Sequence, residues 1–252
     1  MFIFTVINNK GGVGKTTSAQ NLGGALSKYS KAKTLIIDLD PQSSLTKGFR
    51  IAKNERQIGD FLLDKINLEN IKFKYDDYLD ILPSSFDLLN QEQMIANSPT
   101  FPFNLKSNLS KIQDTYKFVI IDCPPALSSL TRIALMACDF YIIPTQAEYF
   151  SYEGLRSLIN FTNQLSAINP SMKLGGVFAT RFNPNIKKRF SQEIISSIKD
   201  QLKDKFLQTY IRENIALTES QAKGKHIFDY NDSSNGAKDY YSLAKELLSK
   251  II

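Results

Sequence analysis

The chain has 252 residues, of which 42% are hydrophobic and 22% charged, with two cysteines, one histidine and no tryptophan. This composition excludes a disulfide-stapled scaffold, a collagen-like fibre and a largely disordered chain. A single histidine, His226, excludes a histidine-rich metal site. No apolar run is long enough to span a bilayer and no signal-peptide pattern opens the chain, so we expect a cytoplasmic protein.

The charge is unevenly distributed along the chain. The formal net charge is +6, from 31 Lys+Arg and 25 Asp+Glu. Residues 1–150 hold 16 basic and 15 acidic side chains, whereas residues 151–252 hold 15 and 10. A basic surface in the second part could attract a polyanion, although an excess of this size also serves solubility.

Apolar, β-branched runs alternate with longer amphipathic segments, which is typical of an α/β fold. The expected strands are Phe2–Asn8, Thr34–Asp40, Leu79–Pro83, Phe118–Asp122, Phe140–Pro144, Gly176–Thr180 and Thr209–Ile211. The expected helices are Thr16–Tyr29, Ser129–Ala137, Tyr152–Ala167, Lys188–Asp204 and Ala237–Ile252, and residues 85–115 are expected to form helix and loop. Several strands are continuous apolar runs, as in a sheet buried on both faces. The sequence therefore predicts one doubly wound α/β domain over residues 1–252, with helices on both faces of a mostly parallel sheet.

A glycine-rich turn, residues 9–17, follows the first expected strand and precedes a helix. Glycines allow successive backbone N–H groups to curl around phosphate oxygens, and the helix adds its positive end. Lys15 would reach the β- and γ-phosphates, and the Thr16 hydroxyl would bind Mg²⁺. The standard phosphate-loop pattern is not strictly met, because Asn9 stands at its first glycine and an additional lysine, Lys10, follows.

Carboxylates follow two other expected strands. Asp38 and Asp40 end one buried run, and Asp122 ends another. In doubly wound sheets ligands bind beyond the carboxyl ends of the strands. An aspartate there can hold Mg²⁺ or orient an attacking water. The same aspartates could instead cap helices or turns.

Residues 10–17, Lys-Gly-Gly-Val-Gly-Lys-Thr-Thr, resemble the deviant Walker A motif of the ParA/MinD family of ATPases, most closely its short, Soj-like partition members. The resemblance implies a P-loop NTPase fold, ATP and Mg²⁺ as cofactors, and a homodimer when ATP is bound. In that family the early lysine contacts the nucleotide of the other subunit. The implied nucleotide-binding residues are Lys10, Gly11, Gly12, Val13, Gly14, Lys15, Thr16, Thr17, Thr180 and Arg181.

The same resemblance assigns the acidic residues. Asp38-Leu-Asp40-Pro-Gln is similar to the first switch of the family, and Asp122-Cys-Pro-Pro to the second. It implies that Asp40 positions or activates the hydrolytic water, with Lys10 and Lys15 completing the catalytic set. The implied metal site consists of Thr16, Asp38, Asp40 and Asp122.

Residues 211–236 resemble the C-terminal signature of the DNA-segregating members, with one departure. Two positions that are usually basic are Glu213 and Ala216, and Arg212 replaces a proline. Other cations would then make the DNA contacts, although those on the helix 188–204 could equally form a solvated face. The expected DNA-binding residues are Lys187, Lys188, Arg189, Lys199, Lys203, Arg212, Lys223 and Lys225.

The family resemblance predicts a partition ATPase associated with the nucleoid. ATP would drive dimerisation, the dimer would bind non-specific double-stranded DNA, and a ParB-like centromere-binding protein would stimulate slow hydrolysis. The alternatives are a ParA-like ATPase that positions another cargo or regulates division or replication, a MinD-like membrane-cycling ATPase, and a reductase-like or synthetase-like P-loop enzyme. No amphipathic tail supports stable membrane association, and Cys123 and Cys138 do not resemble cluster ligands.

Overall fold

A seven-stranded sheet forms the centre of the molecule in the computed structural model, which describes residues 1–252 except 53–56, 99, 149–150, 187–188 and 252. The strand order is β3-β4-β2-β5-β1-β6-β7, and all neighbours are parallel except the edge pair β3 and β4. The strands are β1 (Phe2–Val6), β2 (Thr34–Asp38), β3 (Phe73–Lys74), β4 (Leu79–Leu82), β5 (Phe118–Asp122), β6 (Phe140–Thr145) and β7 (Lys173–Ala179). This confirms the predicted doubly wound, mostly parallel α/β fold.

Each central strand is apolar on both sides because each side of the sheet carries its own core. Successive side chains of a strand point to opposite faces. In β2, Leu35 and Ile37 belong to one hydrophobic cluster, whereas Ile36 between them belongs to the other. All three are fully buried. The continuous apolar runs in the sequence follow directly from this two-sided burial.

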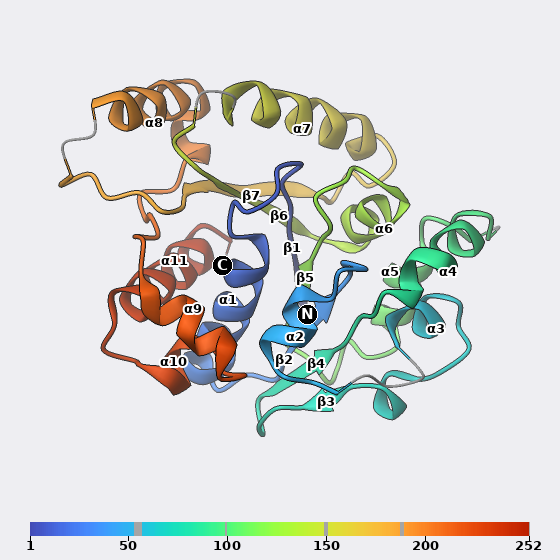
Figure 1. Ribbon diagram of the computed structural model, residues 1–252. Coiled ribbons are helices and arrows are strands. Elements are labelled where there is room, and N and C mark those ends of the chain that lie inside the picture. The colour runs from blue at the N-terminus through green and yellow to red at the C-terminus, as the bar shows by residue number, and fades with distance from the viewer. Residues whose placement is uncertain (53–56, 99, 149–150, 187–188, 252) are drawn as a thin grey trace.

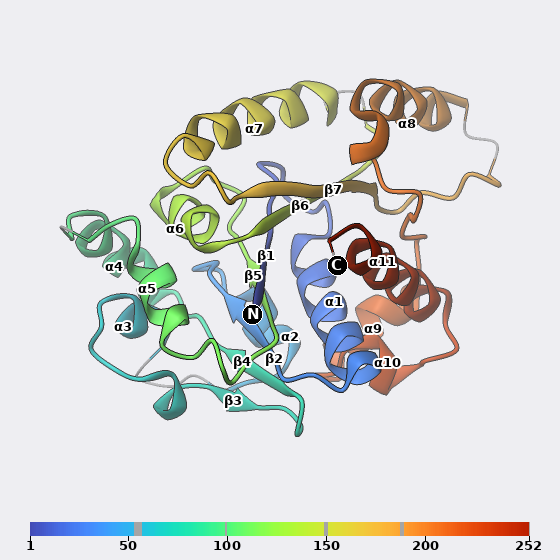
Figure 2. The ribbon, with the colours of Figure 1, turned by 180° about the vertical axis from the view of Figure 1, so that it is seen from behind.

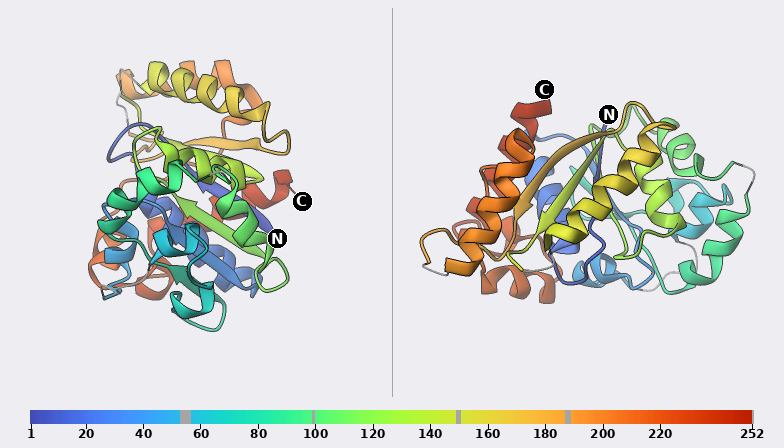
Figure 3. Two further views of the ribbon diagram at one scale, coloured as in Figure 1. Left: turned by 90° about the vertical axis from the view of Figure 1, so that its right-hand side faces the viewer. Right: turned by 90° about the horizontal axis from the view of Figure 1, so that it is seen from above.

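Helices cover both faces of the sheet (Figures 1 and 2). On one side lie α1 (Lys15–Ser30), α2 (Ser44–Gly48), α9 (Ile215–Ala222), α10 (Ile227–Tyr230) and α11 (Asn235–Ile251). On the other lie α3 (Ile58–Leu62), α4 (Asp87–Ala96), α5 (Asn104–Ser110), α6 (Ser129–Ala137), α7 (Ser151–Ser166) and α8 (Arg189–Leu202). Short 3₁₀ turns, η1 (Leu68–Asn70) and η2 (Lys203–Lys205), complete the order. Figure 3 shows the sheet between the two helical layers.

The predicted strand Thr209–Ile211 is wrong. This segment only touches the edge strand β7 through single bridges, Val177 to Phe206 and Thr180 to Ile211. Because the chain returns to β7 at two separate points, no continuous ladder forms. The structure also adds β3, a two-residue strand too short to give a periodic pattern.

Helix α8 is shorter than the predicted helix Lys188–Asp204. It ends at Leu202, because Lys203 takes a positive φ of 50° and begins the turn η2. Lys188 lies outside the described residues. Within the part of the chain that the structure describes, no helix is both long and apolar enough to cross a membrane.

Candidate functional site

The carboxyl ends of the parallel strands meet around a cavity of about 430 Å³. Such an edge is where open α/β sheets bind ligands. The segments that follow β1, β2, β5, β6 and β7 all contribute to it, together with α9 and α11. Its lining includes Gly11, Gly12, Val13, Gly14, Lys15, Thr16, Thr17, Asp40, Pro125, Gln146, Thr180, Arg181, Arg212, Glu213, Asn214, Thr218, Gln221 and Tyr240.

The glycine-rich turn has the geometry of an anion cradle. Gly12 and Gly14 have φ angles of 73° and 92°, a region that glycine adopts without strain. Gly14 is the N-cap of α1, so the positive end of that helix faces the cavity. No side chain caps this helix end, which leaves its first N–H groups for a ligand.

Lys15 folds back over this turn. Its Nζ donates to the backbone oxygen of Lys10 at 2.8 Å, and the residue is only 7% exposed. Burial lowers the pKa of the Lys15 ammonium, and the nearby Asp122 acts in the opposite direction. A buried cation at this place is matched to a phosphate oxygen, which would replace the lost water.

Two buried carboxylates lie side by side at the ends of β2 and β5. Asp38 and Asp122 are paired in register, and both are fully buried. Burial raises the pKa of Asp38 to about 6, and burial together with Asp38 raises the pKa of Asp122 well above its usual range. Thr16 Oγ1 donates to Asp122 Oδ2 at 2.7 Å. Asp122 Oδ1 has no hydrogen-bond partner among the described residues.

These oxygens fit a magnesium ion. A hydroxyl and carboxylates are the hard ligands that Mg²⁺ prefers, with water completing the shell. A dication would also relieve the repulsion between the two carboxylates and engage the unpaired oxygen of Asp122. The predicted metal residues Thr16, Asp38 and Asp122 are therefore brought together beside the glycine-rich turn.

Asp40 lies between this pair and the cavity. Its backbone N–H donates to Asp38 Oδ1 at 3.1 Å, and its own Oδ1 accepts the N–H of Gln42 at 2.9 Å. The residue lines the cavity. Asp40 therefore borders the cavity and is hydrogen-bonded to Asp38.

Lys10 is paired within its own chain. Its ammonium forms an ion pair with Glu148, which follows β6, and its backbone N–H donates to Asn8 Oδ1 at 3.0 Å. Both charged side chains are partly exposed. Lys10 therefore lies at the rim of the site, where it is accessible from outside.

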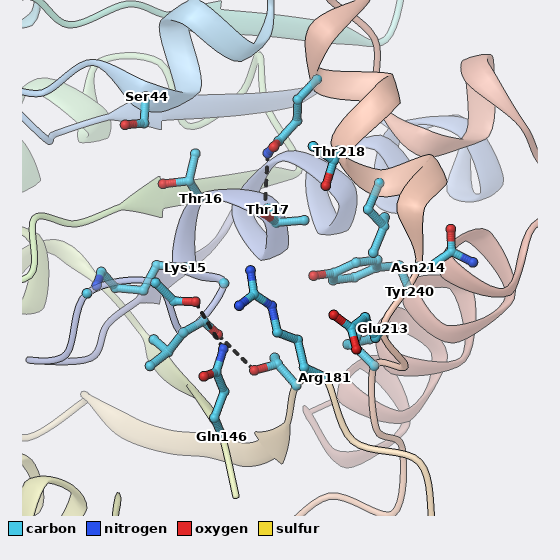
Figure 4. A pocket seen from close by; sticks show the side chains of 18 of the residues that line it. Lys15, Thr16, Thr17, Ser44, Gln146, Arg181, Glu213, Asn214, Thr218 and Tyr240 are labelled. Atoms are coloured by element: carbon cyan, nitrogen blue, oxygen red, sulfur yellow. Dashed lines mark hydrogen bonds between the residues drawn. The ribbon is translucent and has the colours of Figure 1, made fainter. Parts of the chain in front are cut away.

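Thr180 and Arg181 lie at the end of β7, as expected. Thr180 Oγ1 donates to Val13 O at 2.9 Å and so fastens β7 to the glycine-rich turn. Figure 4 shows Arg181 extending into the cavity between Lys15 and Tyr240. Arg181 has a positive φ of 50°, which a non-glycine residue adopts only when its surroundings hold it there.

Of the cavity side chains that sequence reasoning did not assign, Gln146, Gln221 and Tyr240 make hydrogen bonds that shape the site. Gln146 Nε2 donates to Gly12 O at 3.0 Å (Figure 4). Gln221 Nε2 donates to Thr17 Oγ1 at 3.3 Å. Tyr240 lines the cavity and shares a hydrogen bond with Ser18. Gln146 follows a strand end, as Asp40 does, so its position offered a signal. The other two come from helices remote in sequence.

The described members of the predicted DNA-binding set belong to elements in separate regions of the ribbon, with α8 lying apart from α9 and α10 (Figures 1 and 2). Arg189 and Lys199 are on α8, and Lys203 follows it. Lys223 and Lys225 flank Gly224 in the turn between α9 and α10. Lys187 and Lys188 lie outside the described residues.

Arg212 is engaged in an internal ion pair. Its guanidinium binds both carboxylate oxygens of Asp239, with Nη2 at 2.6 Å from Oδ1, and its backbone N–H donates to the same group. This bidentate pair joins the segment between η2 and α9 to α11. A phosphate contact by Arg212 would compete with Asp239 for the same guanidinium.

The chain was compared with known proteins. A family model described as an AAA domain matches residues 1–174. The chain is 35% identical to the chromosome-partitioning ATPase Soj of Treponema pallidum over 246 residues, which covers 97% of this chain and 96% of that protein. A putative plasmid partition protein of Borrelia burgdorferi bound to AMPPNP is 28% identical, with a TM-score of 0.83 and coverage of 100% and 99% of the two chains. Cobyrinic acid a,c-diamide synthase of Mycobacterium smegmatis, with a bound ATP analogue and magnesium, is 26% identical, with a TM-score of 0.79 and coverage of 100% and 96%.

Proposed function

Because this chain belongs to the ParA family of AAA-domain ATPases, we propose that it is a DNA partition ATPase. ATP and Mg²⁺ are its cofactors, and it converts ATP and water to ADP and phosphate. The observation that carries this proposal is the glycine-rich turn with Lys15 folded over it, beside the buried carboxylates of Asp38 and Asp122. The whole of residues 1–252 would act as one P-loop ATPase domain.

The residues around the phosphates have different roles. The backbone N–H groups of residues 11–17 and the Lys15 ammonium bind the phosphate oxygens, as in other phosphate loops. Thr16, Asp38 and Asp122 hold Mg²⁺, which neutralises developing charge on the phosphates. Asp40 orients the attacking water. Thr180 and Arg181 line the cavity beside the glycine-rich turn and would contact the nucleotide from the β7 side.

Lys10 would act across a dimer. Lys15 already occupies the in-chain position over the turn, whereas Lys10 lies at the accessible rim. A lysine that contacts the nucleotide bound to a second subunit stabilises negative charge on the phosphates in the same manner as an arginine finger. Dimerisation then depends on ATP, because the opposed phosphates require the two lysines.

The ATP-bound homodimer would bind double-stranded DNA without sequence preference. The basic excess in residues 151–252 supplies cations even though Glu213 and Ala216 stand at two usual basic positions. Dimerisation doubles the number of phosphate contacts and adds avidity. A ParB-like centromere-binding partner would stimulate the slow basal hydrolysis of ATP. Hydrolysis would then release the protein from the nucleoid into the cytoplasm.

Binding of the purified protein to random duplex DNA tests this proposal. With ATP and Mg²⁺ we expect binding that weakens steeply as salt rises, because each phosphate contact releases counterions. Lys15→Ala should bind neither nucleotide nor DNA, while retaining its fold. Binding of ATP without salt-sensitive binding to DNA would contradict the partition function and leave the ATPase assignment in place.

A further inference from the structure

Thr46 is a buried residue of α2 whose hydroxyl and backbone N–H make three hydrogen bonds, and it does not line the cavity described above. Its hydroxyl donates to Asp38 Oδ2 at 2.7 Å, and its backbone N–H donates to the same oxygen at 2.9 Å. Eight residues separate the two in sequence. One oxygen of a fully buried carboxylate is therefore held by a single residue from outside the cavity.

The direction of the hydroxyl bond is fixed by a third contact. The backbone N–H of Ser84 donates to Thr46 Oγ1 at 2.9 Å. Because the Ser84 N–H can only donate, the hydroxyl oxygen accepts from it, and the hydroxyl hydrogen remains for Asp38 Oδ2. Ser84 follows β4, the strand next to β2, so this contact ties two neighbouring strand ends to the carboxylate.

Asp38 needs such support because of where it lies. Its carboxylate is fully buried next to that of Asp122, and like charges at this distance repel. The backbone N–H of Asp40 holds the other oxygen, Oδ1, at 3.1 Å. Donors to both oxygens favour the charged form and fix the plane of the carboxylate.

We propose that Thr46 is a positioning residue for the ATPase reaction: it holds the Asp38 carboxylate in its orientation at the magnesium site, without itself touching nucleotide or metal. This inference rests on the ATP and Mg²⁺ site of the proposed function. It differs from a packing role for Thr46, because its effect must pass through Asp38. Groups that hold a metal-facing carboxylate typically change metal affinity by about 10–100-fold when removed.

The Mg²⁺ dependence of ATP binding tests the proposal. The probe is a fluorescent ATP analogue, titrated at a series of Mg²⁺ concentrations and again in EDTA. Thr46→Val should raise the Mg²⁺ concentration for half-maximal binding about 10-fold, with binding in EDTA unchanged. Thr46→Ser, which keeps the hydroxyl, should stay within about 2-fold of the unmodified chain. Thr162→Val is the matched control, because Thr162 is a buried threonine of α7 that bonds Tyr141 and Ile159, outside the cavity lining.

A double-mutant cycle with Asp38→Asn separates positioning from packing. If Thr46 acts through Asp38, Thr46→Val should add no further shift in the Mg²⁺ dependence once Asp38 is Asn. An unshifted Thr46→Val curve, or full additivity in the double variant, would overturn the proposal. If the Thr46→Val variant does not fold, Thr46→Ala is measured in its place. If neither variant folds, the Thr46 hydroxyl is required for stability of the fold, and the proposal that it positions Asp38 is overturned. Absence of Mg²⁺-dependent ATP binding by the unmodified chain would instead contradict the proposed function itself.

Discussion

The ammonium of Lys10 and the carboxylate of Glu148 form an ion pair within one chain. The two residues lie 138 positions apart and join the glycine-rich turn to the segment after β6. If Lys10 serves the nucleotide of a second subunit, it must first leave Glu148. The pair therefore competes with dimerisation.

Glu148→Gln should release Lys10 and favour the dimer. Partly exposed pairs contribute about 0.2–1 kcal/mol, so the ATP concentration for half-maximal dimerisation should fall by roughly 1.5- to 5-fold. Sedimentation velocity across an ATP titration, in an Asp40→Ala background that prevents turnover, measures the shift. Lys10→Ala in the same background should lose ATP-dependent dimerisation. An unchanged midpoint for Glu148→Gln would show that the pair does not restrain Lys10.

Asp40→Ala should separate nucleotide binding from turnover. Asp40 lines the cavity but forms no hydrogen bond or ion pair with Lys15 or Thr16 among the described residues, so ATP binding should persist. Removing a group that orients or activates the attacking water typically lowers the rate by about 10²–10⁴-fold. Phosphate release under single-turnover conditions measures this loss. Hydrolysis at the wild-type rate would remove Asp40 from the catalytic set.

Tyr116→Phe should destabilise the fold through Asp80. The phenol donates to Asp80 Oδ2 at 2.6 Å, and that fully buried carboxylate also lies 3.1 Å from Lys33 Nζ and 3.2 Å from Lys72 Nζ. Loss of a hydrogen bond to a buried charged group costs about 1–3 kcal/mol. Urea unfolding measures the change.

The exposed Tyr78 offers the control for this change, since Tyr78→Phe should leave the free energy of unfolding within about 0.5 kcal/mol of the unmodified chain. Equal stabilities for the Tyr116→Phe and Tyr78→Phe variants would mean that the two lysines alone support Asp80.

His226 should make stability sensitive to mild acid. Burial lowers the pKa of His226 in the folded chain, despite the neighbouring Asp229. An unfolded histidine titrates near 6.5, so below that pH the unfolded state binds the additional proton. The His226 contribution is thus fully present above about pH 6.5 and is lost as the pH falls below it. Urea unfolding at pH 7.5, 6.5 and 5.5 should show a flatter pH dependence for His226→Asn. If the free energy of unfolding depends on pH in the same way in the unmodified chain and in His226→Asn, His226 is not the source of the acid sensitivity.

The phosphate loop and the strand-end aspartates could be predicted because their signals are local. A strand, a glycine-rich turn and a helix follow one another within residues 2–30, and the buried runs ending at Asp38 and Asp122 mark the same edge of a parallel sheet. The hydrophobic periodicity identifies these strands, and the rule that parallel strands share one carboxyl edge predicts that the residues after them lie close together.

The partners of those residues could not be predicted because they depend on side-chain placement in three dimensions. Nothing in the sequence around Thr46 distinguishes it from a surface threonine of a short polar segment. Its proposed role follows from its two hydrogen bonds to Asp38 Oδ2 and from the approach of Ser84 to the same hydroxyl. Likewise, the pairing of Arg212 with Asp239 depends on how α11 packs, and it changes which cations remain available to a polyanion.

The bridges from Phe206 and Ile211 to β7 have a further consequence for the behaviour of the protein in concentrated solution. An uncovered edge strand offers a row of backbone groups on which another chain can add a strand and aggregate. Here the Leu207 N–H donates to Val177 O and the Ile211 N–H donates to Ala179 O. Backbone oxygens on the outer side of β7 therefore already accept hydrogen bonds from the same chain. The opposite edge is the two-residue strand β3, which ends in Lys74. Both borders of the sheet thus discourage intermolecular β-pairing, so that chains brought together in the proposed dimer would not associate further through their sheet edges.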